Sequence, residues 1–156
     1  LLSKKQFNEF FLTYLKQAVE RMNEFQGGTS IHICGNTKDR WEEVVEAKVS
    51  GFWVDNCESL KELKEAFGDR VAISGNVIPV EVLRDGTPEE IAENVRFCIE
   101  QAGDNPCGYN LCPGCTTPVG TSKENMIAFM NAAAIYGRGA RKGYMPKGIE
   151  KNYKII

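Results

Sequence analysis

Two short segments carry residue types that bind transition metals in proteins. His32, the only histidine of the chain, stands two residues before Cys34, and Cys115 follows a Pro-Gly pair much later. Alternate residues of a β-strand point to the same side, so His32 and Cys34 converge if they share a strand. One imidazole and two thiolates suit Zn²⁺, and three protein ligands leave one position open for a substrate. If the segment that ends at Cys115 faces the one that carries His32 and Cys34 across a barrel mouth, the three residues predict an open zinc site.

Cys112 leaves a second arrangement possible at the same place. It stands three residues before Cys115, a spacing found in zinc knuckles and in redox pairs. If Cys112 also binds, the site becomes a closed Cys3His centre with a structural role and no room for a substrate. If strand alternation sends Cys112 elsewhere, the site stays open, and we favour this second arrangement.

The charge of the open ligand set indicates the type of reaction. Zn²⁺ with two thiolates and a neutral imidazole is formally neutral, so it is a weaker Lewis acid than a tri-histidine site. Such a centre is poorly suited to activating water. It is well suited to holding a substrate thiol as a thiolate, which stays nucleophilic at neutral pH. The set therefore predicts alkyl transfer to a thiol.

Polar residues also end two further apolar segments. Asp55 follows the segment that ends at Val54, and Asn76 stands in a Ser-Gly-Asn-Val sequence. Polar residues at strand ends line the sites of α/β proteins, although they also form turns. We expect Asp55 and Asn76 to bind the substrate.

These residues are positioned by strands that alternate with helices. We expect an amphipathic helix over residues 5–25 and then four strand–helix units. The strands are predicted at residues 29–34, 51–55, 70–77 and 108–112, and the helices at 37–49, 60–67, 87–102 and 122–136. Strict alternation predicts parallel strands, because a parallel pair needs a crossover helix. The carboxyl ends of such strands share one edge of the sheet, where α/β folds place their sites.

Spacing alone leaves two architectures open, an open doubly wound sheet and half of a (β/α)8 barrel. No Gly-x-Gly-x-x-Gly motif follows a predicted strand, which disfavours dinucleotide binding. We expect residues 1–137 to form this α/β domain. Residues 138–156 hold six Lys or Arg residues against one acid, and we expect them to form a loose basic tail.

The composition is that of an ordinary globular domain. The 156 residues are 42% hydrophobic and 26% charged, and the net charge is -2. A negative balance argues against nucleic acid as a partner. No apolar run approaches the roughly 20 residues that span a bilayer, and no signal peptide opens the chain, so we expect a cytoplasmic protein without membrane contact.

Four motifs resemble the carboxyl-terminal half of the uroporphyrinogen decarboxylase superfamily. They are IHICGN at residues 31–36, SGNVIP at 74–79, DGTPEE at 85–90 and PGC at 113–115. The resemblance implies a (β/α)8 TIM barrel of which this chain supplies strands five to eight and their helices. Unpaired outer strands would then favour a homodimer or association with the missing amino-terminal half.

The histidine and cysteine motifs resemble one branch of the superfamily, the zinc-dependent methylcobamide:coenzyme M methyltransferases. This resemblance implies that His32, Cys34 and Cys115 bind zinc, which activates a thiol such as coenzyme M. It also implies a methylated corrinoid protein as the methyl donor. Two alternatives remain: a uroporphyrinogen decarboxylase-like enzyme of tetrapyrrole metabolism, and a non-catalytic module that zinc stabilises.

Overall fold

A single parallel sheet forms the centre of the molecule. The computed structural model describes residues 2–25 and 27–150. Each strand pairs with the next along the chain, in the order β1 (Ser30–Ile33), β2 (Gly51–Val54), β3 (Ala72–Val77) and β4 (Tyr109–Pro113). The register places His32, Trp53, Ser74 and Asn110 in one row across the sheet. The predicted parallel strands are confirmed.

Helices connect the strands as the alternation predicted. The 3₁₀ turn η2 (Lys38–Arg40) and helix α3 (Trp41–Glu46) follow β1, and α4 (Leu60–Phe67) follows β2. The π-helical segment η3 (Pro79–Arg84) and α5 (Pro88–Ala102) follow β3. Helix α6 (Lys123–Tyr136) follows β4. Sequential parallel strands with helices between them make this fold part of a (β/α)8 barrel. None of the helices in residues 2–25 and 27–150 is long and apolar enough to cross a membrane.

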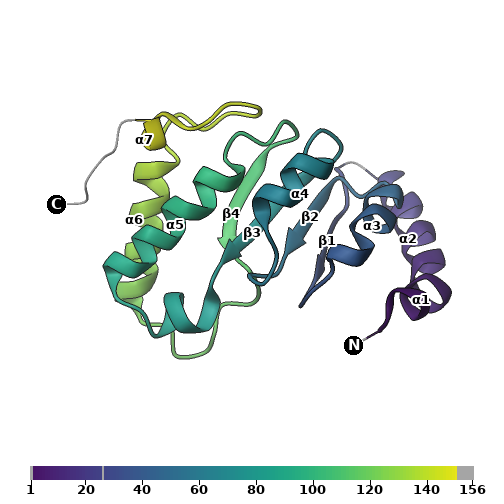
Figure 1. The fold of residues 1–156 in the computed structure, drawn as a ribbon, viewed down its shortest axis with the longest axis horizontal. Coiled ribbons are helices and arrows are strands. Elements are labelled where there is room, and N and C mark those ends of the chain that lie inside the picture. Colours follow the sequence, from purple (N-terminus) through teal and green to yellow (C-terminus); the bar gives the residue numbers. More distant parts are fainter. Residues whose placement is uncertain (1, 26, 151–156) are drawn as a thin grey trace.

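The two faces of the sheet differ in character. Helices α3, α4 and α5 cover one face (Figure 1), and there Phe52, Val54 and Ile73 are fully buried in the core. The row that starts at His32 lies on the opposite face, because its residues alternate with these core residues. That opposite face is the side that lines the interior in a closed barrel. It carries hydroxyl, amide, imidazole and indole groups.

The start of α5 agrees with the helix predicted at residues 87–102. The Thr87 hydroxyl accepts a hydrogen bond from the Glu90 amide, and the Glu90 carboxylate accepts one from the Thr87 amide at 2.8 Å. Pro88 occupies the first helical position. This capping box satisfies amide groups that the helix itself leaves without partners. The start of the helix is therefore set by the local sequence.

Asn125 attaches α6 to the end of η3. It is buried, and its Nδ2 donates to the carbonyl oxygens of Leu83, Arg84 and Gly86 at 3.0, 3.0 and 3.1 Å. We expect Asn125→Asp to lower the free energy of unfolding by about 2–3 kcal/mol, because a carboxylate cannot donate to these buried carbonyls. Urea denaturation measures the effect. The exposed Asn131 of the same helix is the matched control, and Asn131→Asp should change stability by less than about 0.5 kcal/mol.

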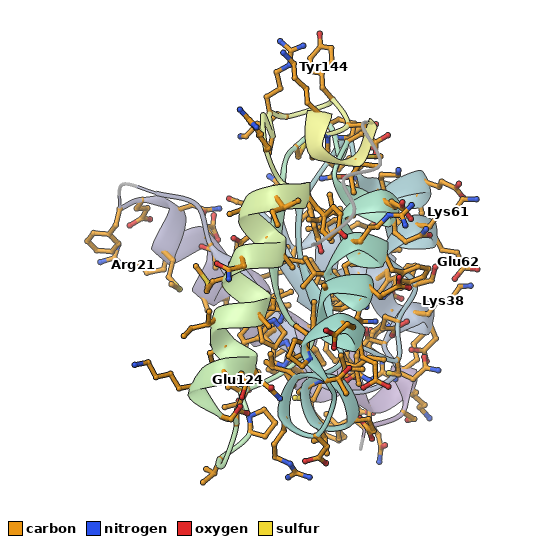
Figure 2. The ribbon with its side chains drawn as sticks, turned by 90° about the vertical axis from the view of Figure 1, so that its left-hand side faces the viewer. Arg21, Lys38, Lys61, Glu62, Glu124 and Tyr144 are labelled. Atoms are coloured by element: carbon orange, nitrogen blue, oxygen red, sulfur yellow. The ribbon has the colours of Figure 1, made fainter. Side chains whose placement is uncertain are left out.

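The amino-terminal helix forms but buries little of its apolar surface. It runs through α1 (Lys4–Phe7), the π-helical segment η1 (Asn8–Leu12) and α2 (Thr13–Asn23). Only Phe7, Leu15 and Val19 are buried in these segments, and exposed side chains include Phe10, Phe11, Tyr14 and Met22. The helix lies beside α3 at the β1 end of the sheet (Figure 1), and Arg21 projects away from the body in Figure 2. The predicted helix is confirmed, but its apolar face is only partly covered.

The segment after α6 differs from the prediction. We expected a loose tail, but its described part is folded against the domain. Residues 138–149 turn back through a short bridge between Arg141 and Tyr144 and reach α7 (Lys147–Glu150), which contacts α5 and α6. Gly148 is buried, and a Cβ there would lie 2.1 Å from the Ile135 carbonyl oxygen, so only glycine permits this approach. Tyr144 points outward (Figure 2). Positions 151–156 of the expected tail lie outside the described residues.

Candidate metal site

His32, Cys34 and Cys115 meet at the carboxyl end of the sheet. His32 lies on β1, Cys34 follows it, and Cys115 stands two residues after β4. The Cys34 sulfur lies 3.1 Å from His32 Nε2 and 3.4 Å from the Cys115 sulfur, and all three potential ligand atoms lie within 4.8 Å of one another. Two thiolates on a tetrahedral zinc, each at 2.3 Å, lie about 3.8 Å apart. The donor types and their separations therefore fit Zn²⁺.

The tautomer of His32 is set by its other ring nitrogen. Nδ1 lies 3.0 Å from the backbone carbonyl oxygen of Trp53. A carbonyl oxygen only accepts, so Nδ1 carries a proton, and in the neutral ring Nε2 holds the lone pair that can bind a metal. That lone pair faces the Cys34 sulfur. A histidine whose other N–H donates to a carbonyl is the usual form of a metal ligand.

The Cys34 thiol is neutral in the metal-free chain. The neighbouring Cys115 thiol, followed by burial and the charge of Asp55, raises the pKa of Cys34 above its usual value. At neutral pH the Cys34 thiol is therefore mostly protonated. Metal binding at this cluster therefore displaces a proton from Cys34.

Cys115 reaches the cluster by crossing the end of the sheet. β1 and β4 form opposite edges of the four-stranded sheet, so the loop after β4 passes over β2 and β3. At Gly114 a Cβ would lie 2.4 Å from the Asn56 backbone nitrogen, so a side chain would block this crossing. The Gly114 amide donates to the Val77 carbonyl at 2.8 Å, and Trp53 Nε1 donates to the Pro113 carbonyl at 2.8 Å. These contacts fix the turn that carries Cys115.

Asp55 holds the loop that carries Cys34. Its carboxylate accepts hydrogen bonds from the Gly35 amide at 2.9 Å and from the Cys57 amide at 3.1 Å. Burial alone would raise the pKa of Asp55, but these two N–H donors outweigh burial and hold the pKa below its usual value. The ionised carboxylate thus ties the loops after β1 and β2 together.

Asn76 lies away from the cluster, on the helix-covered side. It is buried, and its Nδ2 donates to the carbonyl oxygens of Asp55 at 3.0 Å and Glu58 at 2.8 Å. The Cys98 thiol lies 3.7 Å from its Oδ1. Asn76 lines a separate cavity of about 280 Å³ there. The structure gives it hydrogen bonds to loop carbonyls and does not bring it to His32, Cys34 and Cys115.

Comparison with known proteins decides the family. The family model described as Uroporphyrinogen decarboxylase (URO-D) matches residues 1–136. The chain belongs to the uroporphyrinogen decarboxylase family. Within this family it is similar to proteins with two different names, so membership alone does not select one reaction.

Three relatives show that the URO-D family members similar to this chain include both methyltransferases and decarboxylases. The methylcobamide:CoM methyltransferase MtbA of Methanosarcina acetivorans is 31% identical over 136 residues, which cover 87% of this chain and 38% of the relative. A uroporphyrinogen decarboxylase of Pseudoalteromonas translucida is also 31% identical, over 85% of this chain and 37% of the relative. A solved structure of a methyltransferase from Methanosarcina mazei matches with a TM-score of 0.71 and 27% identity, over 85% of this chain and 37% of that one. The chain thus spans well under half the length of these relatives.

A cavity of about 520 Å³ opens beside the cluster of this URO-D family chain. It lies on the barrel-interior face, and its lining includes Trp53, Ser74, Asn110, Cys112, Cys115 and Thr116. None of the described residues that line it carries a formal charge. A ligand entering this cavity meets hydroxyl, amide and indole groups next to the Cys115 sulfur.

Cys112 lies outside the cluster. The group of potential ligand atoms within 4.8 Å contains His32, Cys34 and Cys115, and Cys112 instead lines the cavity. Burial raises the pKa of the Cys112 thiol to about 11, which keeps it protonated at neutral pH. The structure therefore does not assemble the closed Cys3His arrangement that the Cys112-x-x-Cys115 spacing left possible.

Replacing Cys112 tests this assignment. We expect Cys112→Ser to bind zinc within about twofold of the unmodified chain, because the Cys112 thiol lies outside the group of converging ligand atoms and is protonated. Competition titration against a chromophoric chelator measures the affinity. A loss as large as the one caused by replacing Cys115 would show instead that the centre is closed by three sulfurs.

Two residues that shape the site were not singled out from the sequence. Trp53 reads as an ordinary aromatic residue of a buried strand, and Gly114 as a turn residue. Their roles come from contacts across the sheet, 2.8 Å from indole to carbonyl for Trp53 and a close backbone approach for Gly114. The Pro-Gly-Cys sequence was the one available signal, since glycine permits close approach beside a ligand.

Proposed function

We propose that this chain is the zinc-bearing part of a methyltransferase that moves a methyl group from a methylated corrinoid protein to a thiol such as coenzyme M. The observation that carries the proposal is the convergence of His32, Cys34 and Cys115 within 4.8 Å, with His32 Nε2 free to bind. Similarity to the methylcobamide:CoM methyltransferase supports it. The chain's partial coverage of that relative makes the whole reaction a proposal for the completed barrel.

The residues of the chain would hold the metal and orient the acceptor. His32, Cys34 and Cys115 supply three of four tetrahedral positions, which leaves one for the sulfur of the substrate. Zinc bound there would supply the positive charge that keeps a thiol ionised at neutral pH. The Trp53 carbonyl holds the His32 ring in its binding tautomer, and Asp55 holds the loop beside Cys34. The uncharged cavity beside Cys115 offers the acceptor a route to the open position.

The barrel itself needs further strands. In the described part of the chain, β1 pairs with β2 alone and β4 with β3 alone, so two strand edges stay available. Open edges of a parallel sheet favour pairing with other strands. We propose that a second copy of the chain or an amino-terminal half of the barrel completes the fold around the cavity.

A decarboxylase-like enzyme of tetrapyrrole metabolism is the second candidate. The observation in its favour is the 31% identity to the uroporphyrinogen decarboxylase of Pseudoalteromonas translucida, as high as that to the methyltransferase. Such an enzyme would not use the cluster of His32, Cys34 and Cys115. A non-catalytic zinc module would need a fourth protein ligand, and the cluster in the described residues holds three.

Zinc content and the response to thiol separate these functions. Zinc would be measured in protein purified without added metal, and its X-ray absorption recorded with and without coenzyme M. About one zinc per chain that gains a third sulfur ligand with the thiol is the result expected from three protein ligands with one open position. Zinc already bound by three sulfurs and one nitrogen, and indifferent to thiol, would indicate a structural centre. If the protein contains no zinc, even after reconstitution with metal, the result would favour the decarboxylase-like function.

A further inference from the structure

We propose that Trp53 is a positioning residue that connects His32 with the turn that carries Cys115, and that its indole N–H sets the position of Cys115. Three groups of this residue touch the site. Its carbonyl oxygen accepts a hydrogen bond from His32 Nδ1 at 3.0 Å, and its Nε1 donates one to the Pro113 carbonyl at 2.8 Å. Its ring lies over the His32 ring, with centroids 4.1 Å apart and planes 34° apart.

The place of β2 in the sheet explains why one residue can do this. β2 lies next to β1, and Trp53 pairs in register with His32. The side chain points to the barrel-interior face, where it lines the cavity together with residues of β3, β4 and the following loop. It thus spans from the strand that carries the histidine to the turn that carries Cys115. Neither edge strand reaches the other directly.

Trp53 acts on the turn at its first residue. Pro113 ends β4 and stands two residues before Cys115, so the hydrogen bond to its carbonyl fixes where the crossing begins. Further along, Thr116, Thr117 and Val119 are exposed, and Val119 is 98% exposed. A segment with so little burial has low local stability, so its position depends on its attachment points. The indole hydrogen bond is one of these points and the Gly114 amide is another.

The same orientation allows Trp53 to be changed without opening the core. Its neighbours Phe52 and Val54 point to the helix-covered face and are fully buried, whereas Trp53 is half-buried on the cavity side. Trp53→Phe keeps an aromatic ring beside His32 and keeps the backbone carbonyl. It removes the indole N–H. The variant therefore removes the hydrogen bond to the turn that carries Cys115 and keeps the contacts to His32.

The metal part of this inference rests on the proposed function. We expect Trp53→Phe to bind zinc about 10–100-fold more weakly, the usual range when a group that orients a ligand is lost. Thermal melting of the metal-free variant should match that of the unmodified chain. Cobalt bound to the variant should show weaker thiolate-to-metal absorption, because Cys115 is held less firmly at the metal.

Trp41 provides the matched control. It is the other tryptophan of the chain, it is buried in the core, and its indole N–H donates to the Thr37 hydroxyl at 3.3 Å. Trp41→Phe makes the same chemical change away from the three ligands, and zinc affinity should stay unchanged. In that variant Trp53 supplies the sole indole N–H signal in nuclear magnetic resonance. Hydrogen-bonded to Pro113, this proton should exchange with solvent more slowly than that of a free indole, a readout that does not depend on Trp53→Phe folding.

Amide hydrogen exchange tests the tether without metal. In the metal-free chain, exchange at residues 115–117 should be faster in Trp53→Phe than in Trp41→Phe or the unmodified chain. Unchanged exchange together with a rapidly exchanging Trp53 indole would overturn the tether. Faster exchange with unchanged zinc affinity would overturn its role in holding Cys115 for the metal. If the unmodified chain binds no zinc, the proposed function fails, and the exchange data still decide whether Trp53 holds the turn.

Discussion

Replacing Cys34 with serine is expected to weaken zinc binding by roughly 10²–10³-fold. Its sulfur is the central atom of the cluster, 3.1 Å from His32 Nε2 and 3.4 Å from the Cys115 sulfur. Structural zinc sites with four ligands bind with about 10–16 kcal/mol, or roughly 2.5–4 kcal/mol for each ligand. At about 1.4 kcal/mol for each tenfold change, that loss corresponds to two to three orders of magnitude. Chelator competition at fixed pH measures it, and Cys115→Ser should behave alike.

Cys107 supplies the control for this substitution. It is a free cysteine in the loop that precedes β4, and its amide donates to the Gly68 carbonyl at the opposite end of the sheet. Cys107→Ser removes one thiol without touching the cluster, so its zinc affinity should equal that of the unmodified chain. Equal losses in the two variants would show that zinc binds thiols without regard to position. That result would remove the cluster as the basis of the proposed function.

The fold followed from patterns that act over short distances. The start of the helix predicted at residues 87–102 could be placed from sequence, because the residues that cap it, Thr87 to Glu90, lie within one turn of helix. Alternating apolar strands and helices determined a parallel sheet, since the crossover connections leave little choice. The π-helical segment Pro79–Arg84 was missed, because nothing in its apolar spacing distinguishes it from a loop before α5. The burial of the amino-terminal helix was also out of reach, because periodicity shows a face but not what covers it.

The candidate site also has a part that local sequence predicts and a part that depends on the fold. His32 and Cys34 could be paired from strand alternation alone. Their meeting with Cys115 depended on how the loop after β4 crosses the sheet, a property of the fold that a family resemblance supplied. Asn76 was placed at a strand end correctly, yet its side chain lies on the other side of the sheet from Trp53. Strand-end position therefore did not determine side-chain direction.

Zinc itself is expected to stabilise the folded chain by about 4 kcal/mol when its free concentration is a thousand times the dissociation constant. For a chain of this length that corresponds to a rise in melting temperature of roughly 8–16 °C. The reason is that the ligands, which come from β1 and from the loop after β4, meet only when the chain is folded. Zinc therefore binds the folded chain in preference to the unfolded one, in which Cys34 and Cys115 are held only by the 81 positions of chain that separate them.

Differential scanning calorimetry with and without zinc checks this stabilisation, and a chelator should reverse it. Cys34→Ser is the decisive comparison, because it keeps the fold and removes the central ligand. Its melting temperature should respond little to the same zinc concentration, while that of Cys107→Ser should rise as in the unmodified chain. An equal rise in Cys34→Ser would place the stabilising metal elsewhere. A metal that binds the folded state at this cluster must stabilise it, so a chain that binds zinc there without any rise would contradict binding to the native arrangement.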